Sequence, residues 1–418
     1  MFTLGTLNQL KAQDQQTCGF NRDFFNPSYN NWYQKAVLES AKTYPERRGR
    51  VFRDTEFVIP VVFHFVHHPN FPPSTSFIMK MMSEINADFS RMNADTIKLR
   101  SMFISRAGSP KIRFVLVDKD ENGQPSNGYT VRSTWNTFGA EPYQSYRTWH
   151  TMKFDSCGGR SAWNTQKYLN IWVCNLQSPK SGKIYYSGFA TPPLKAPHWG
   201  SIYSDSAIDG IVIDQFSYSQ TYRTSTLTHE IGHYLGLRHV SGDPPNIVDS
   251  AMCKYDDSLF DTPRVLHQNY YTCDTTINSC IEPANDYPDM LENFMDYSGD
   301  NCKNTFTKQQ VFIMRYCLNT LRPQLSQFVV TTIVKPSLFL LDIYPNPNKG
   351  SIHIDFKDSF SNDYSVVLYD YLGQKVLESQ ILQPQSILNL ECLSTGLYQL
   401  TIVNRQSITV DRRPIYKD

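Results

Sequence analysis

Residues 228–239 read Thr-His-Glu-Ile-Gly-His-Tyr-Leu-Gly-Leu-Arg-His, and this stretch predicts a metal centre built on a helix. His229 and His233 are four residues apart, so they lie on one face of a helix and can hold the same metal ion. Glu230 lies at the adjacent edge of that face, where its carboxylate can take a proton from a metal-bound water. The alternative is a chance match of the pattern inside an ordinary helix.

The residues that follow complete the predicted site. Gly236 can end the helix, because glycine adopts a left-handed turn at no steric cost. The chain then turns back, so that His239 can serve as a third ligand. Three neutral imidazoles with one open coordination position suit a catalytic zinc ion. We expect a methionine-containing turn below such a metal, and residues 293–297, Asn-Phe-Met-Asp-Tyr, supply one. Met295 would form the apolar floor, and Tyr297 would reach the zinc or the transition state.

The combined pattern of residues 229–239 and 293–297 resembles a metzincin metalloprotease. Three further stretches narrow the resemblance to the pappalysin family, also called cytophagalysins: residues 162–164, 168–174 and 209–213. The likeness extends from about residue 50 to residue 325. It implies an α+β protease domain, in which a twisted sheet and the active-site helix precede a loop-rich C-terminal subdomain. It also implies a zinc endopeptidase that cleaves proteins or peptides.

The expected chemistry is metal-assisted hydrolysis of a peptide bond. The zinc ion would lower the pKa of its water and polarise the scissile carbonyl group. Glu230 would remove the proton of that water as general base and later deliver it to the leaving amine. Tyr297 would help to stabilise the oxyanion. The alternative function is a non-catalytic secreted adhesin on the same scaffold, which would have no need of Glu230.

Length and composition restrict the other functional classes. A chain of 418 residues is long for one domain, so two or more are expected. The formal net charge is +1 and no basic patch stands out, which argues against nucleic acid as the main partner. No apolar run approaches the ~18 residues of a membrane-spanning helix, so no transmembrane span is expected. Nine cysteines fit an oxidising compartment.

Four of the cysteines, Cys253, Cys273, Cys280 and Cys302, cluster on the C-terminal side of the metal motif. Their spacing alone allows three pairings. The resemblance to pappalysins implies the pairs Cys253–Cys280 and Cys273–Cys302, which would staple the segment that carries the methionine turn. The alternative is a second, structural zinc site, although no CxxC pair supports it. Cys174 lies in an apolar run and is expected to be a buried free thiol.

The N-terminal residues suggest export and latency. Residues 1–13 resemble the end of a truncated bacterial signal peptide, although they are too short and too polar for a complete one; the alternative is a cytosolic N-terminus. Residues 14–52 are expected to form a pro-segment, with a processing site at the basic cluster 46–50. Cys18 could occupy the open zinc position and exclude the catalytic water, giving a latent zymogen. The alternative is an idle or disulfide-paired thiol.

The predicted protease domain spans residues 53–325. Buried strands are expected at residues 57–66, 111–118, 168–175 and 208–214. Helices are expected at residues 77–89, 225–235 and 307–321. His64, His67 and His68 lack helical spacing and a carboxylate neighbour, so we interpret them as strand-edge histidines rather than as metal ligands.

Acidic residues are dense after the metal motif: Asp256, Asp257, Asp261, Asp274, Asp286 and Asp289. Carboxylate oxygens in loops suit calcium, and the family resemblance implies structural calcium in this region. The alternative is a merely solvated acidic loop, because no EF-hand pattern is present.

The C-terminal region has a different pattern. After a linker at residues 326–342, residues 343–418 contain short alternating strands flanked by turns, which predict a small β-sandwich. The turn-flanked stretches resemble the C-terminal sorting domain of the type IX secretion system. This resemblance implies the secretion machinery as a partner and a protein that is secreted or attached to the outer surface. The alternative is a carbohydrate-binding or protein-binding module.

Overall fold

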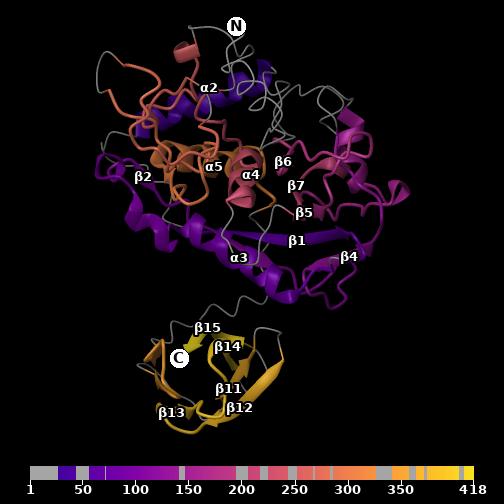
Figure 1. Ribbon diagram of the computed structural model, residues 1–418, viewed down its shortest axis with the longest axis vertical. Coiled ribbons are helices and arrows are strands. Elements are labelled where there is room, and N and C mark those ends of the chain that lie inside the picture. The colour runs from indigo at the N-terminus through magenta and orange to yellow at the C-terminus, as the bar shows by residue number, and fades with distance from the viewer. Residues whose placement is uncertain are drawn as a thin grey trace, which may run out of the picture. The chain divides into compact units, whose positions relative to one another are not determined.

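The chain divides into two compact units, of which the larger carries the metal motif and the smaller is C-terminal (Figure 1). None of the helices in the described part of the chain is long and apolar enough to cross a membrane. The computed structural model describes residues 27–43, 56–70, 72–140, 146–193, 206–216, 225–242, 252–266, 269–282, 286–325, 341–356, 364–370, 374–403 and 409–418.

In the part of the larger unit that the structure describes, six strands form the central sheet: β1 (Phe57–His67), β3 (Ile112–Leu116), β4 (Tyr129–Ser133), β5 (Leu169–Cys174), β6 (Gly188–Ala190) and β7 (Ile211–Asp214). The strand order is β3-β1-β5-β7-β6, and β4 pairs with the second half of β1. The neighbours are parallel except β6, which is antiparallel to β7 and forms one edge. Strands β1, β5 and β7 are apolar and almost entirely buried, as expected for parallel strands covered on both faces.

Among the described residues the α-helices are α2 (Pro27–Thr43), α3 (Thr75–Ser90), α4 (Thr226–Tyr234) and α5 (Lys308–Thr320). Helix α4 carries the histidine motif and packs against β7 and the edge strand β6 (Figure 1). Helix α2 packs against α5. Helix α3 is fastened to β3, because the Asn86 side chain exchanges two hydrogen bonds with the backbone of Phe114.

Shorter elements connect these helices and strands. The short strands β2 (Ala107–Gly108) and β8 (Phe306–Thr307) pair with each other in antiparallel orientation. The 3-10 helices are η2 (Ala94–Lys98), η3 (Ser101–Phe103), η4 (Tyr146–Lys153), η5 (Asp155–Cys157), η6 (Ser206–Ile208) and η7 (Met252–Lys254).

A capping box starts α5 and also reaches the methionine turn. The Thr307 side chain accepts a hydrogen bond from the backbone of Gln310, and the Gln310 side chain accepts one from the backbone of Thr307. The Gln310 amide also exchanges two hydrogen bonds with the Asn293 side chain, at 2.9 and 3.1 Å. Asn293 in turn accepts a hydrogen bond from the backbone N–H of Met295 at 2.9 Å. The start of α5 therefore fixes the turn that carries Met295.

The smaller unit consists of two antiparallel sheets. The strands are β9 (Leu341–Tyr344), β10 (Ser351–Phe356), β11 (Tyr364–Tyr369), β12 (Lys375–Ile381), β13 (Gln385–Asn389), β14 (Gly396–Val403) and β15 (Thr409–Lys417). The sheet orders are β13-β10-β9 and β12-β11-β14-β15. Alternate residues of both sheets, such as Ile352, Ile354, Val366 and Leu400, meet in one apolar core. This arrangement is the small β-sandwich that the strand pattern predicts.

The structure confirms the predicted α+β fold class. The expected helices correspond to α3, α4 and α5, and the four expected buried strands to β1, β3, β5 and β7. The interpretation of His64 as a strand-edge residue is wrong, because His64 is buried in the middle of a central strand, between β4 and β5. Its ring bridges Thr130 and Asn170, at 2.9 and 2.8 Å, so hydrogen bonds and not an edge position accommodate this polar side chain.

Candidate metal centre and active site

Three buried histidines come together at α4 and the turn that follows it. His229 and His233 are one helical turn apart, and Gly236, with a φ of 92°, ends the helix and lets His239 return. The Nε2 atoms of the three rings lie 3.0, 3.1 and 3.2 Å from one another. Among the described residues, this is the one group of three close ligand side chains that could hold a metal ion.

Backbone carbonyl groups orient two of these rings. Nδ1 of His229 donates a hydrogen bond to the Phe294 carbonyl at 2.6 Å, and Nδ1 of His233 donates one to the Leu237 carbonyl at 2.9 Å. Burial, followed by the neighbouring His239, lowers the pKa of both rings well below the ordinary value, so both are neutral at pH 7. Neutral rings that donate through Nδ1 turn the Nε2 lone pairs toward one another. A cation at their centre satisfies this arrangement.

Glu230 lies on α4 next to the first histidine and is fully buried. Its side chain runs toward the edge strand β6: a Cβ atom built on Gly188 would lie 3.2 Å from Cγ of Glu230. Gly188 therefore leaves the space that the Glu230 side chain needs between α4 and β6.

The methionine turn lies against α4 and the histidine rings. Met295 is fully buried, and its carbonyl group accepts a hydrogen bond from the backbone of Val240, next to His239, at 3.3 Å. The ring of Tyr297 lies beside two of the histidines, with centroids 4.8 Å from His239 and 5.7 Å from His229. The structure thus brings Met295 and Tyr297 together with the metal motif, about 60 residues away in the sequence.

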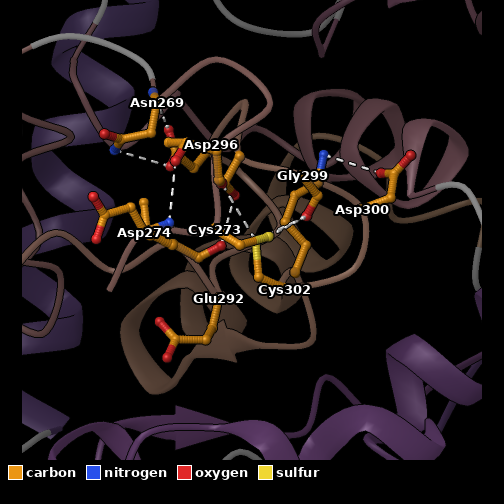
Figure 2. The surroundings of a disulfide bond; sticks show 12 residues. Asn269, Cys273, Asp274, Glu292, Asp296, Gly299, Asp300 and Cys302 are labelled. Atoms are coloured by element: carbon orange, nitrogen blue, oxygen red, sulfur yellow. Dashed lines mark hydrogen bonds and ion pairs between the residues drawn. A yellow bond between two sulfur atoms is a disulfide. The ribbon is translucent and has the colours of Figure 1, made fainter. Parts of the chain in front are cut away.

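Both disulfides that the family resemblance implies are present, Cys253–Cys280 and Cys273–Cys302. The second pair joins Cys273 to the segment that follows Met295, which contains Asp296, Gly299 and Asp300 (Figure 2). Cys174 is a buried free thiol, as predicted, and burial raises its pKa well above the ordinary value.

Helix α2 lies within the predicted pro-segment and contacts the chain just before the third histidine. The hydroxyl of Tyr29 donates a hydrogen bond to the Gly236 carbonyl at 2.9 Å. The guanidinium of Arg238 packs over the rings of Tyr29 and Tyr33 and donates a hydrogen bond to the Asn30 side chain. Cys18, the predicted latent-state ligand, lies outside the described residues.

Two polar contacts that support α4 have no signal in the sequence. Asp300 accepts hydrogen bonds from the backbone and hydroxyl groups of Ser225, immediately before the helix, and pairs with Lys303 at 3.3 Å. Although burial opposes it, Lys303 and Ser225 hold the pKa of Asp300 below its usual value. At the other end, Arg322 donates a hydrogen bond to the Tyr234 carbonyl and forms a buried bidentate pair with Asp209, at 2.6 and 2.9 Å.

The acidic residues after the metal motif mostly form local hydrogen bonds. Asp257 accepts from the backbone of Leu259 and from Thr262, whereas Asp289 accepts from the backbone and hydroxyl of Ser279. In the part of the chain that the structure describes, they do not gather into a group of three like the histidines. Structural calcium therefore stays a prediction.

Comparisons with known proteins agree with this fold. The model of the family described as pregnancy-associated plasma protein-A, a peptidase family, matches residues 155–319. The model described as the secretion system C-terminal sorting domain matches residues 342–416. The second match coincides with the small β-sandwich.

Solved structures of mirolysin from Tannerella forsythia are similar to this chain. The mature enzyme in complex with a cleaved peptide is 33% identical, with a TM-score of 0.55, and the match covers 66% of this chain and 97% of that one. A promirolysin mutant is 30% identical, with a TM-score of 0.59, and the match covers 74% of this chain and 97% of that one.

An extracellular metalloprotease from Arthroderma otae is 34% identical over 165 residues, which are 37% of this chain and 53% of the relative. One from Arthroderma gypseum is 29% identical over 162 residues, which are 38% of this chain and 50% of the relative. The chain thus spans about half the length of these curated relatives.

The protease-like fold with three convergent histidines defines a metzincin-type metalloprotease scaffold. Within that class the chain belongs to the pappalysin family, and a secretion-system sorting domain forms its C-terminal unit.

Proposed function

We propose that this protein is a secreted zinc-dependent endopeptidase that is made as a latent precursor. The observation that carries the proposal is the convergence of three buried Nε2 atoms within 3.2 Å of one another, with a buried glutamate on the same helix. A scaffold used only for adhesion has no need of a carboxylate beside such a cluster. The family membership and the extracellular metalloprotease relatives support the same function.

The donor set fits zinc. Zinc–imidazole bonds of about 2.0–2.1 Å at tetrahedral angles separate the ligand nitrogens by about 3.3 Å, close to the observed separations of 3.0 to 3.2 Å. We assign His229, His233 and His239 as the ligands. When bound, the ion supplies Lewis acidity: it makes a water molecule more acidic and polarises the substrate carbonyl group.

Glu230 is the proposed general base, because it is the buried carboxylate that adjoins the histidines on α4. It would take a proton from the attacking water and then pass it to the leaving amine. Tyr297, whose ring lies beside His239 and His229, would donate a hydrogen bond to the developing oxyanion. Met295 has a supporting role only, since it packs beneath α4.

The edge strand β6 favours a peptide substrate. We expect an extended peptide substrate to pair with β6, the edge strand of the sheet, which within the described residues pairs with β7 alone. The Glu230 side chain extends from α4 toward β6, so the scissile bond of such a peptide would lie close to the proposed general base.

Latency and export are the remaining parts of the proposal. Helix α2 packs against α5 and contacts Gly236 and Arg238, so the predicted pro-segment is anchored beside the third ligand. The promirolysin match covers more of this chain than the mature mirolysin match, which supports a precursor of similar organisation. Cys18 is the proposed latent-state ligand. The sorting domain favours export by the type IX secretion machinery.

Hydrolysis of casein by the processed protein tests the proposal. We expect one zinc ion per chain by elemental analysis, activity that a chelator removes, and activity that zinc restores. Folded, processed protein that holds no stoichiometric metal, or that binds zinc without cleaving any member of a peptide library, would contradict it.

A further inference from the structure

A segment outside the assigned site runs alongside the end of the methionine turn. The backbone N–H of Tyr271 donates a hydrogen bond to the Tyr297 carbonyl at 2.9 Å, and the N–H of Gly299 donates one to the Thr272 carbonyl at 3.0 Å. The disulfide Cys273–Cys302 closes this pairing at its far end (Figure 2). Residues 269–273, which we call the brace, are thereby attached to the turn at several points.

The first residue of the brace holds the residue between Met295 and Tyr297. Asn269 donates two hydrogen bonds to the Asp296 carboxylate, one from its backbone at 3.2 Å and one from its side chain at 3.1 Å (Figure 2). Both residues are buried. Because hydrogen bonds to a buried carboxylate are worth more than those between neutral surface groups, this contact fixes the backbone just before Tyr297.

The second residue of the brace packs directly on Tyr297. The ring centroids of Tyr270 and Tyr297 lie 5.3 Å apart in an edge-to-face arrangement. Tyr297 itself is only 8% exposed and lies against His239 and His229, whereas Tyr270 is 37% exposed. The contacts therefore form a series from Tyr270, through Tyr297, to the histidine rings.

We propose that Asn269 and Tyr270 are positioning residues for catalysis, which act by holding the Tyr297 hydroxyl in its reactive orientation. The proposal rests on the role of Tyr297 in the proposed function. A hydrogen-bond donor stabilises a transition state most when its orientation is fixed before the reaction, since no reorganisation is then needed. His229 and His233 receive their orientation from other groups, the carbonyls of Phe294 and Leu237. Loss of the brace should therefore reduce turnover and leave the metal in place.

The test compares variants of the full chain after processing. Tyr270→Leu should lower kcat about tenfold, with KM changed less than about twofold, because one preorganised donor is worth up to about 10²–10³ in kcat. Tyr270→Phe keeps the ring contact and should retain near-normal kcat. Tyr271→Leu is the matched control: this side chain is 61% exposed, and its backbone N–H contact survives the substitution. Zinc content by elemental analysis should be equal in all variants.

A double-mutant cycle shows whether the brace acts through Tyr297. In the Tyr297→Phe background, which lacks the hydroxyl, Tyr270→Leu should have no further effect on kcat. Two outcomes would overturn the positioning role of the brace and leave Tyr297 in its role. In one, Tyr270→Leu lowers kcat by the same factor in both backgrounds. In the other, Tyr270→Leu and the control Tyr271→Leu have the same kcat. Full kcat in Tyr297→Phe alone would instead overturn the assigned role of Tyr297, and the brace with it.

A second variant covers the case in which Tyr270→Leu folds poorly. Asn269→Ala removes the side-chain hydrogen bond to Asp296 and keeps the backbone one, so it perturbs the same turn with a smaller change in packing. Asn269→Ala should, like Tyr270→Leu, lower kcat and leave KM and the zinc content unchanged. An unchanged kcat in folded Asn269→Ala would overturn the role of Asn269 as a positioning residue.

Discussion

The sulfur of Met295 lies directly beneath Gly232 of α4, the helix that carries the histidine motif. A Cβ atom built on Gly232 would lie within 3.0 Å of Met295 Sδ, a separation that real Cβ atoms essentially never show. Gly232 falls between His229 and His233, so the turn and the helix touch at the centre of the site. The missing side chain is what allows the methionine to approach.

Gly232→Ala should therefore push α4 and the turn apart. We expect the free energy of unfolding to fall by about 1–3 kcal/mol, the usual effect of overpacking a closed core, and zinc to be lost faster to a chelator. Thermal unfolding and the rate of zinc release measure the two effects. The double variant Gly232→Ala/Met295→Ala should recover part of the stability. If the single variant is as stable as the wild type, the contact does not constrain the helix.

Glu230→Gln should separate metal binding from chemistry. The amide keeps the shape of the buried side chain and cannot accept a proton, so kcat should fall by about 10²–10⁴ while zinc content stays complete. Peptide cleavage assays and elemental analysis on the same preparation check this expectation. Retained turnover at full zinc occupancy would reject the general-base role.

Cys18→Ala tests the proposed latency. If the thiolate occupies the open zinc position in the precursor, its removal should give a precursor with measurable activity before processing and faster self-maturation. Electrophoresis over time, with Cys392→Ala as a control on an exposed thiol of the sorting domain, follows the conversion. Unchanged latency would assign inhibition to the rest of the pro-segment.

Arg322→Met should unfold the protein at a lower denaturant concentration. The guanidinium is buried, pairs with Asp209 at 2.6 Å and binds the carbonyl that ends α4. Its removal leaves the buried Asp209 carboxylate without its bidentate partner, at a cost of about 3–5 kcal/mol. Adding Asp209→Asn should restore part of that loss, because the remaining group is then neutral. Urea unfolding of both variants, compared with wild type, measures the difference.

Because the His64 side chain is buried, we expect the free energy of unfolding to decrease in mild acid. Burial lowers its pKa from the ordinary value near 6.5 to about 4. Between these values the unfolded chain binds a proton that the folded chain does not, so stability falls as the pH falls from about 6.5 toward 4. One such group contributes on the order of 3 kcal/mol over that interval. Urea unfolding at several pH values should show a shallower decline for His64→Gln than for wild type.

Local sequence patterns were sufficient for much of the fold and for the histidine cluster. The spacing of His229, His233 and His239 around Gly236 follows from helix geometry and one left-handed turn, both of which are local. Alternation of apolar residues likewise indicated the C-terminal sandwich. His64 shows where the pattern fails: it interrupts an apolar run, and nothing nearby indicates that Thr130 and Asn170 will satisfy its ring.

The sequence by itself determined the three histidines that we propose as ligands, their spacing and the secondary structure that presents them, because these depend on interactions within about one helical turn or strand. Only the tertiary structure decided how the site is supported: the pairing of residues 269–273 with the methionine turn, the Gln310–Asn293 amide pair and the buried Arg322–Asp209 pair. Each of these joins positions distant in the chain, and hydrogen-bonding side chains carry no periodic signal of their partners. These contacts depend on which polar groups are buried together once the core has packed, because buried polar groups need hydrogen-bond partners.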